Sequence, residues 1–163
     1  MTEDIVRDLG LLTLGSRLKR IGENLQADTQ RIMQGHGVTV QVTQYPYLAA
    51  LHRDGALTVG EIAEAVGISQ PGATRAVGQL ADAGLVDISV SDDDQRRRQI
   101  SLTDAGRDVI VFAKETVWPD IEAAVTDLCD GFGADLLLHL AAIEDGLAQR
   151  PLTQRTLKTG KSR

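Results

Sequence analysis

The chain has 163 residues, of which 42% are hydrophobic and 25% charged, and its net charge is −6. Such a chain is long enough to bury about 70% of its unfolded surface, and the composition is that of a globular protein rather than a disordered one. No apolar run approaches the ~20 residues that cross a bilayer. The first residues lack the pattern of a secretory signal, and a single cysteine cannot form an internal disulfide. We therefore expect a cytoplasmic protein.

Sequence motifs for catalysis and cofactor binding are absent. The patterns G-x-G-x-x-G, G-x-x-x-x-G-K-[ST], H-E-x-x-H and G-x-S-x-G do not occur. His36, His52 and His139 have no metal-ligand spacing around Cys129. The sequence therefore predicts a protein that is not an enzyme and that holds no metal and no cofactor.

Charge is distributed unevenly along the chain. Residues 108–148 contain nine acidic side chains and one basic side chain, whereas residues 149–163 contain five basic side chains and no acidic one. We expect this basic tail to be disordered and either to attract phosphates or only to aid solubility. Three arginines also stand together at 96–98, so an anion-binding surface there would be small and local.

Both ends of the chain predict apolar helices. The spacing of Leu14, Leu18, Ile21, Leu25 and Ile32 places them on one face of a long helix. The predicted apolar helix covers residues 5–33, and a Gly-His-Gly sequence at 35–37 breaks it. Towards the other end, we expect Thr103 to cap a long helix that bends near Pro119. A last helix over residues 134–148 is apolar on all sides and needs to be covered.

The middle of the chain predicts a helix followed by a helix-turn-helix. The first helix is expected to begin at Thr43, with Pro46 in its first turn, and to end at residues 54–55. Thr58 and Glu61 then have the spacing of a capping box. Ser69 is the expected cap of the next helix. Glycines at 67 and 84 end the two short helices, and two such helices joined by a tight turn form a helix-turn-helix.

A β-ribbon is expected after the helix-turn-helix. Apolar residues alternate with polar ones over 85–90 and again over 99–102, which is typical of half-buried strands. The charged segment 91–98 lies between them and would form the tip of the ribbon. The expected fold is therefore mainly α with a small β-ribbon, a winged helix-turn-helix flanked by N- and C-terminal helices.

The outer face of the second short helix carries groups that can read base edges. With Ala73, Val77 and Leu80 facing inward, the helical repeat places these residues outward: Pro71, Thr74, Arg75, Gly78 and Asp82, with Gln70 and Gln79 beside them. Arg75 can bond bidentately to guanine, Gln70 to adenine, and Thr74 can meet a thymine methyl or a phosphate. The alternative is a surface helix that contacts only solvent.

The charged tip of the ribbon favours the DNA-reading interpretation. Arg96, Arg97 and Arg98 can reach a minor groove or the flanking phosphates and displace condensed counterions. Asp94 stands two residues before Arg96 and can orient its guanidinium by a charge-assisted hydrogen bond. The alternative is a solvated loop in which acids and bases neutralise one another.

Several motifs together resemble the multiple-antibiotic-resistance regulator (MarR) family. They are the stretch 57–71, L-T-V-G-E-I-A-E-A-V-G-I-S-Q-P, the run L-A-D-A-G-L-V at 80–86, and the stretch 94–103 followed by Ala-Gly at 105–106. The family pattern D-x-R-x-x-x-[VIL]…LT falls on Asp94, Arg96, Ile100, Leu102 and Thr103. The resemblance covers residues 5–148.

The resemblance implies a homodimeric winged-helix transcription factor, usually a repressor of its own or neighbouring genes, on a pseudo-palindromic operator. It places Ser69, Gln70, Thr74 and Arg75 in the major groove and Arg96 in the minor groove, with Asp94 bracing that arginine. We add Thr58, Pro71, Arg97 and Arg98 to the expected DNA-contacting residues. Pro71 and Gly72 depart from the bulkier polar residues common in the family, which leaves fewer base contacts.

Domain boundaries follow from these elements. We expect an N-terminal dimerisation helix in 1–38, the winged helix-turn-helix in 39–106, C-terminal dimerisation helices in 107–148 and the basic tail in 149–163. Apolar helices at both ends must be covered, and a second copy would cover them. Two-fold symmetry would then hold the two reading helices about 34 Å apart, one turn of B-DNA.

The resemblance also implies a small lipophilic or phenolic effector that releases the DNA. Tyr45, Tyr47, His52 and Trp118 are candidates for lining its pocket, and ordinary packing of scarce aromatics is the alternative. Cys129 could be a redox sensor, but its place in an apolar stripe favours a buried structural thiol.

Other functions stay open at this stage. A winged helix can dock onto proteins without touching nucleic acid, or this chain can act as the regulatory partner of an acetyltransferase, because some MarR-like proteins carry that domain. RNA or single-strand binding is disfavoured, because aromatics make up 3% of the chain and none lies on the reading face.

Overall fold

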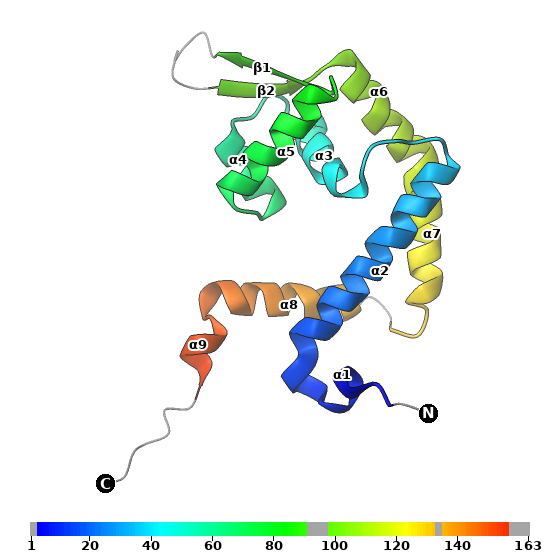
Figure 1. Ribbon diagram of the computed structural model, residues 1–163, viewed down its shortest axis with the longest axis vertical. Coiled ribbons are helices and arrows are strands. Elements are labelled where there is room, and N and C mark those ends of the chain that lie inside the picture. Colours follow the sequence, from blue (N-terminus) through cyan, green and yellow to red (C-terminus); the bar gives the residue numbers. More distant parts are fainter. Residues whose placement is uncertain (1–2, 91–97, 133–134, 157–163) are drawn as a thin grey trace. The chain divides into compact units, whose positions relative to one another are not determined.

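A computed structural model describes residues 3–90, 98–132 and 135–156, which are mostly helical with one two-stranded antiparallel sheet (Figure 1). The expected fold class, mainly α with a β-ribbon wing, is confirmed. The chain divides into two units, Met1–Glu122 and Ala123–Arg163, which we describe separately. None of the helices described has the length and apolar character of a membrane span.

The elements follow one another in the predicted order. The first unit contains α1 (Ile5–Asp8), a 3₁₀ helix (Gly10–Thr13), α2 (Leu14–Gly35), a second 3₁₀ helix (Val42–Gln44), α3 (Tyr45–Asp54), α4 (Val59–Val66), α5 (Gln70–Asp82), β1 (Val86–Val90), β2 (Arg98–Leu102), α6 (Asp104–Phe112), a π-helical segment (Ala113–Val117) and the first residues of α7 (Trp118–Leu128). The second unit contains the rest of α7, α8 (Asp135–Gln149) and α9 (Leu152–Arg155).

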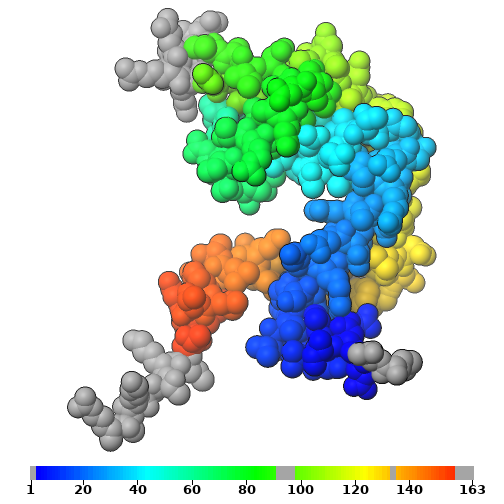
Figure 2. All heavy atoms as spheres, viewed as in Figure 1, coloured from blue at the N-terminus to red at the C-terminus, as the bar shows by residue number. Residues whose placement is uncertain are grey.

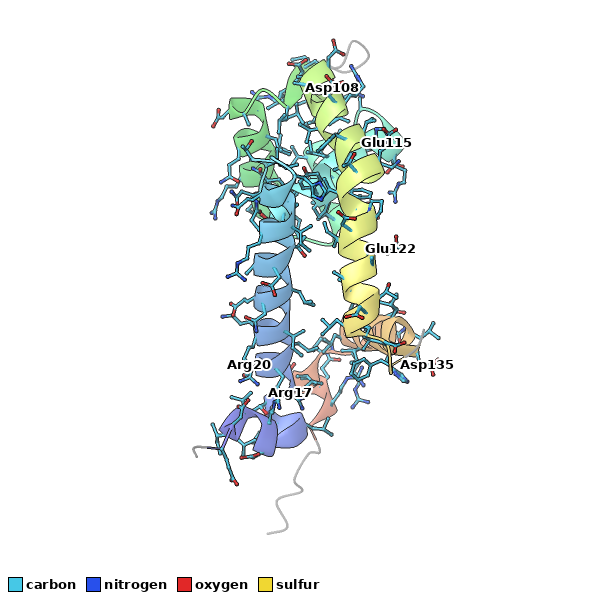
Figure 3. All side chains as sticks on the ribbon, turned by 90° about the vertical axis from the view of Figure 1, so that its right-hand side faces the viewer. Arg17, Arg20, Asp108, Glu115, Glu122 and Asp135 are labelled. Atoms are coloured by element: carbon cyan, nitrogen blue, oxygen red, sulfur yellow. The ribbon has the colours of Figure 1, made fainter. Side chains whose placement is uncertain are left out.

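The N-terminal helix is shorter than the sequence predicted. Gly10 has a φ of +56°, a left-handed conformation that glycine adopts without steric cost, and it begins the 3₁₀ helix that separates α1 from α2. Asp4 caps α1 and forms an ion pair of 2.9 Å with Arg20, which Figure 3 labels at the α1 end of α2. The hydrogen bond from Arg20 lowers the pKa of Asp4. This pair therefore joins α1 to α2.

The start of α3 also differs from the prediction. Thr43 lies inside a 3₁₀ helix, whose capping box is formed by Gln41 and Gln44, and α3 begins only at Tyr45. The longer glutamine side chain at 44 reaches back to the amide of Gln41 at 3.3 Å, so the hydroxyl of Thr43 is not needed as a cap. Pro46 lies in the first turn of α3, as predicted.

The hydrophobic core lies in the first unit and draws on every element from α2 to the π-helical segment. Its buried members are Met33, Tyr45, Leu48, Leu51, Ile62, Ala63, Ala73, Val77, Leu80, Leu85, Val86, Ile100, Leu102, Ile110, Ala113 and Val117. The core therefore holds α3, α4, α5, the ribbon and α6 together as one body. In the described part of the second unit, no residue is buried.

The β-ribbon pairs as the alternation predicted, with Val86 opposite Leu102 and Ile88 opposite Ile100. Arg98 pairs with Val90 and therefore belongs to β2, whereas the sequence had placed it in the tip. The rest of the predicted tip, 91–97, lies outside the described residues. Leu57 adds a bridge that the sequence did not reveal, because its amide and carbonyl bond to Ile100 at 3.0 and 2.8 Å.

The disruption expected near Pro119 is a π-helical segment that immediately precedes it. Proline lacks an amide hydrogen, and its ring collides with the carbonyl four residues earlier in a regular α-helix, here that of Glu115. A wider turn relieves this collision. Nearby, the side chain of Asp120 bonds to Nε2 of His36 at 2.9 Å and links the first turn of α7 to the C-terminal end of α2.

The second unit corrects the prediction of a disordered tail. The last apolar helix is present as α8, but residues 152–155 of the predicted tail form α9. The guanidinium of Arg155 donates to the carbonyls of Gly146 and Arg150, and that of Arg150 donates to the carbonyl of Gln154. The two arginines thus join α9 to the end of α8 through backbone carbonyls, which the sequence alone did not indicate.

The junction between α5 and α6 is the tightest backbone contact at any glycine in the described residues. Thr103 caps α6 by accepting from the amide of Gly106 at 3.0 Å, and its hydroxyl donates to the carbonyl of Gly84 at 2.8 Å. The amide of Thr103 bonds to the carbonyl of Leu85 at 3.1 Å. A Cβ at position 106 would lie 2.0 Å from that same carbonyl oxygen. Only glycine therefore lets α6 approach the end of α5 this closely.

We expect Gly106→Ala to lower the free energy of unfolding by about 3 kcal/mol, because backbone and not a flexible side chain blocks the added methyl. Urea denaturation of both proteins measures the difference. Gly60→Ala is the matched control, since its Cβ would meet only the Thr58 hydroxyl oxygen at 4.0 Å. It should be neutral or raise stability by up to about 1 kcal/mol. Equal stability of the two variants would contradict the tight junction.

Candidate nucleic-acid interface

The helix-turn-helix consists of α4 and α5, and local capping sets its turn. Thr58 and Glu61 form the predicted capping box at the start of α4: the hydroxyl and the amide of Thr58 each donate to the Glu61 carboxylate at 2.7 Å. Gly67 ends α4 with a φ of +73°, and the next amide, of Ile68, returns to the carbonyl of Ala63 at 2.9 Å. Thr58, predicted to contact DNA, thus uses its hydroxyl proton within the protein.

The helix α5 has the two faces that its sequence predicted. Ala73, Ala76, Val77 and Leu80 are buried against the core. The outward residues are Gln70, Pro71, Thr74, Arg75, Gln79 and Asp82, all exposed, with the half-buried Gly78 among them. Figure 2 shows the green atoms of α5 at the surface. This exposed face is free to enter a groove of a ligand.

The N-terminal end of α5 is shaped by two short polar side chains. Ser69 is the N-cap, as predicted, and its hydroxyl oxygen accepts from the amide of Gly72 at 3.4 Å. The hydroxyl of Thr74 donates to the carbonyl of Gln70 at 2.9 Å. Pro71 occupies the first turn, where its missing amide hydrogen costs nothing. The positive end of the helix dipole therefore faces outward beside small side chains.

The charge on the outer face of α5 suits an anionic partner. From Gln70 to Ala81 the helix has one charged residue, Arg75, and the only carboxylate is Asp82 at the far end. Arg75 is exposed and has no hydrogen bond or ion pair within the described part of the chain. Its guanidinium is thus available to an external acceptor.

The wing contributes one described cation. Arg98 is exposed at the outer end of β2, opposite Val90. Ile88 and Val90 of β1 are also exposed, although alternation places them on the side of the buried Val86. The ribbon thus extends past the core. The predicted wing residues Asp94, Arg96 and Arg97 lie outside the described residues.

The four aromatic and histidine residues predicted to share an effector pocket do not converge. Tyr45 lines a cavity of about 400 Å³ between the 36–40 loop, α3 and α6, with Val38, Val109 and Phe112. His52 and Trp118 line a different cavity of about 480 Å³, together with Arg53 and Lys114. Tyr47 is half-buried against the core and lines neither of these cavities.

Tyr45 is the one described residue with a buried side-chain polar atom that lacks a hydrogen-bond partner. Its side chain is largely buried, and burial raises the pKa of its hydroxyl, which therefore stays protonated at neutral pH. An unpaired buried hydroxyl costs free energy. Sequence reasoning had proposed Tyr45 only for its aromatic ring.

Two further points concern metal ligands and Cys129. Among the described residues, no group of three or more histidine, cysteine or acidic side chains is arranged to hold a metal ion. Cys129 is half-buried just after the end of α7, rather than fully enclosed in a core. It is not among the residues that line the two cavities described above.

Residues 36–97, which contain α3, α4, α5 and β1, match the MarR family model. This part of the chain is similar to the MarR family. The matched segment contains the capping box, the turn at Gly67 and the whole of α5, so it includes the geometry described above. The resemblance predicted from the sequence motifs is confirmed.

Several solved structures of transcriptional regulators share the fold of this chain. The repressor CouR, solved on a 23-mer DNA duplex, is 27% identical, with 88% of this chain and 99% of CouR covered and a TM-score of 0.72. PcaV from Streptomyces coelicolor, solved with its natural ligand, is 21% identical, covering 92% and 99%, with a TM-score of 0.68. BpsR of Bordetella bronchiseptica, whose DNA binding is regulated by 6-hydroxynicotinic acid, is 19% identical. The match covers 83% of this chain and 92% of BpsR, with a TM-score of 0.66.

Proposed function

We propose that this MarR-family regulator binds a pseudo-palindromic DNA operator as a homodimer and represses its own or neighbouring genes until a small effector releases it. In each subunit α5 enters a major groove, with Ser69, Gln70, Pro71, Thr74 and Arg75 towards the bases and phosphates. The wing residues Arg96, Arg97 and Arg98 reach the adjoining minor groove or its phosphates, with Asp94 as a brace. CouR, a repressor solved on a duplex, supports this arrangement.

The observation that carries DNA binding is the outer face of α5. It presents an exposed Arg75 that has no partner among the described residues, and it carries no carboxylate before Asp82. Small side chains and the absence of negative charge favour entry between two rows of phosphates, and a free guanidinium can pair with guanine or a phosphate. A surface helix that meets only solvent has no need of either property.

Dimer formation is supported by apolar side chains that the single chain leaves exposed. Leu11 and Leu12 are 87% and 82% exposed in the N-terminal segment, and Leu137 and Leu138 of α8 are 72% and 67% exposed. Burying such side chains is favourable by about 25 cal/mol per Å² of apolar surface. A second copy that covers both segments would also set the spacing of the two reading helices.

The effector site is best supported at the cavity beside Tyr45. Its walls are largely apolar, and the buried hydroxyl of Tyr45 lacks a partner. A small lipophilic or phenolic molecule that accepts a hydrogen bond from this hydroxyl would remove the cost of leaving it unpaired. The cavity lies between α3 and α6. A ligand there can shift the reading module only if it binds one arrangement of these two helices better than another.

Replacing Arg75 and Arg96 by alanine tests DNA binding directly. Fragments selected from the source genome with the unmodified protein provide the duplex probe, which should contain two half-sites one helical turn apart. We expect each substitution to weaken binding about tenfold to a hundredfold in a gel-shift assay, because each removes a contact to a base edge or a groove.

Arg31→Ala is the matched control, because Arg31 is paired with Asp28 on α2, away from the reading face. It should leave the affinity unchanged. Retention of full affinity by the Arg75 and Arg96 variants, or no DNA binding by the folded protein, would favour a protein-docking module or an acetyltransferase partner instead.

Glutamates at positions 137 and 138 test the dimer. In sedimentation velocity we expect the unmodified protein to be a dimer at micromolar concentration and the Leu137→Glu, Leu138→Glu variant to be a monomer. Both leucines are exposed in one chain, so their change should disturb association rather than folding. Ile88→Glu places a charge on an exposed apolar residue of the wing and should leave the dimer intact. A monomeric unmodified protein would refute the proposal.

Tyr45→Phe tests the effector cavity. Removing an unpaired buried hydroxyl should raise the free energy of unfolding by about 1 kcal/mol in urea denaturation. Phenol, used as a probe, should raise the melting temperature of the unmodified protein and have a smaller effect on the variant. Tyr47→Phe, outside the cavity, should respond to phenol normally. Destabilisation by Tyr45→Phe would mean that the hydroxyl is already satisfied.

A further inference from the structure

The hydroxyl of Thr74 is committed within α5. It donates to the carbonyl of Gln70, one turn earlier, at 2.9 Å. A threonine hydroxyl has a single proton, so Thr74 cannot also donate to a phosphate oxygen or to a base acceptor while this bond is in place. Towards a ligand it presents a methyl group and the remaining lone pairs of its oxygen.

The commitment of the hydroxyl also orients the methyl group. The atoms bonded to Cβ occupy staggered positions. Because Oγ1 is turned back to the previous turn, the methyl carbon Cγ2 occupies another of these positions on the exposed side chain. Thr74 therefore presents a methyl group where an uncommitted polar side chain would present a hydrogen-bond donor.

The neighbours of Thr74 on the same face extend this chemistry. Pro71 lies three residues before it and Gly78 four residues after it, the spacing that brings residues together on one helix face. Neither has a side-chain donor. A Cβ at Gly78 would meet nothing within 4 Å, so the helix backbone is open to approach there. We call Pro71, Thr74 and Gly78 the donor-free stripe.

The donor-free stripe suits one group in the major groove. Phosphates and the guanine edge offer acceptors and need donors from the protein, which the stripe lacks. The thymine C5-methyl is the apolar group that the major groove of unmodified DNA displays. On the proposed function, in which α5 enters that groove, we propose that the stripe recognises a thymine methyl in each half-site, with Thr74 Cγ2 as its main contact.

The first experiment removes the methyl from the DNA. A duplex selected from a random library by the unmodified protein is resynthesised with deoxyuridine in place of thymidine at one position at a time, which preserves base pairing. We expect one thymine in each half-site at which the change weakens binding about fourfold, the effect of losing contact with one methyl-sized group. Other thymines should show no effect.

The second experiment removes either the methyl or the hydroxyl from the protein. Thr74→Ser keeps the hydroxyl and should bind the thymine and uracil duplexes equally well. Thr74→Val keeps the methyl and should retain the fourfold preference for thymine. Circular dichroism melting checks both variants, whose exposed position makes their folding independent of the change.

The outcomes separate the inference from the function on which it rests. Equal binding of thymine and uracil duplexes by the unmodified protein would overturn the inference and leave DNA binding intact. Loss of binding by Thr74→Val without any methyl preference would show that the oxygen accepts from adenine or cytosine, which also overturns it. Failure to retain any duplex would overturn DNA binding itself.

Discussion

The close approach of α6 to the end of α5 is the constraint on which the rest of the DNA-reading module depends. Glycine at 106 lets the first turn of α6 press against the carbonyl of Leu85, while Thr103 binds the carbonyls of Gly84 and Leu85. These contacts join three elements at one point: the end of the reading helix, the base of the wing and the start of the helix that leads towards the second unit.

The contacts of this junction hold the reading helix beside the base of the wing. Leu80, Leu85 and Ile100 pack in the core beneath this junction. Leu57 adds two backbone hydrogen bonds to Ile100 of β2. On the proposed function, binding to two grooves would benefit from such an arrangement, since a loosely held wing would lose entropy on binding. The outer face of α5 is thus defined by its own residues, but its placement beside the wing depends on contacts between residues that are distant in the sequence.

The two ends of the chain have a different physical character from the module between them. No described residue of the second unit is buried, and leucines of the N-terminal segment are largely exposed. These segments gain little from folding alone. On the proposed function, a second copy covers them, and folding, subunit association and the spacing of the reading helices would then be linked in one equilibrium.

Several local features follow from the sequence by itself, because each depends on a few neighbouring residues. The Thr58–Glu61 capping box, the Ser69 and Thr103 caps, the glycine turns and the pairing of the ribbon all appear where the pattern predicted them. The face of α5 that points outward is equally local, because the helical repeat and the buried alanine and valine positions define it.

Other features required the tertiary structure, because they depend on residues distant in sequence. The sequence did not indicate the bridge from Leu57 to Ile100, the return of Arg155 to Gly146 or the break at Gly10. It grouped Tyr45 with His52, but the fold places them at separate cavities. Periodicity determines which side of a helix is apolar; only the packing of whole elements decides which polar atom is left buried and unpaired and how close two backbones come.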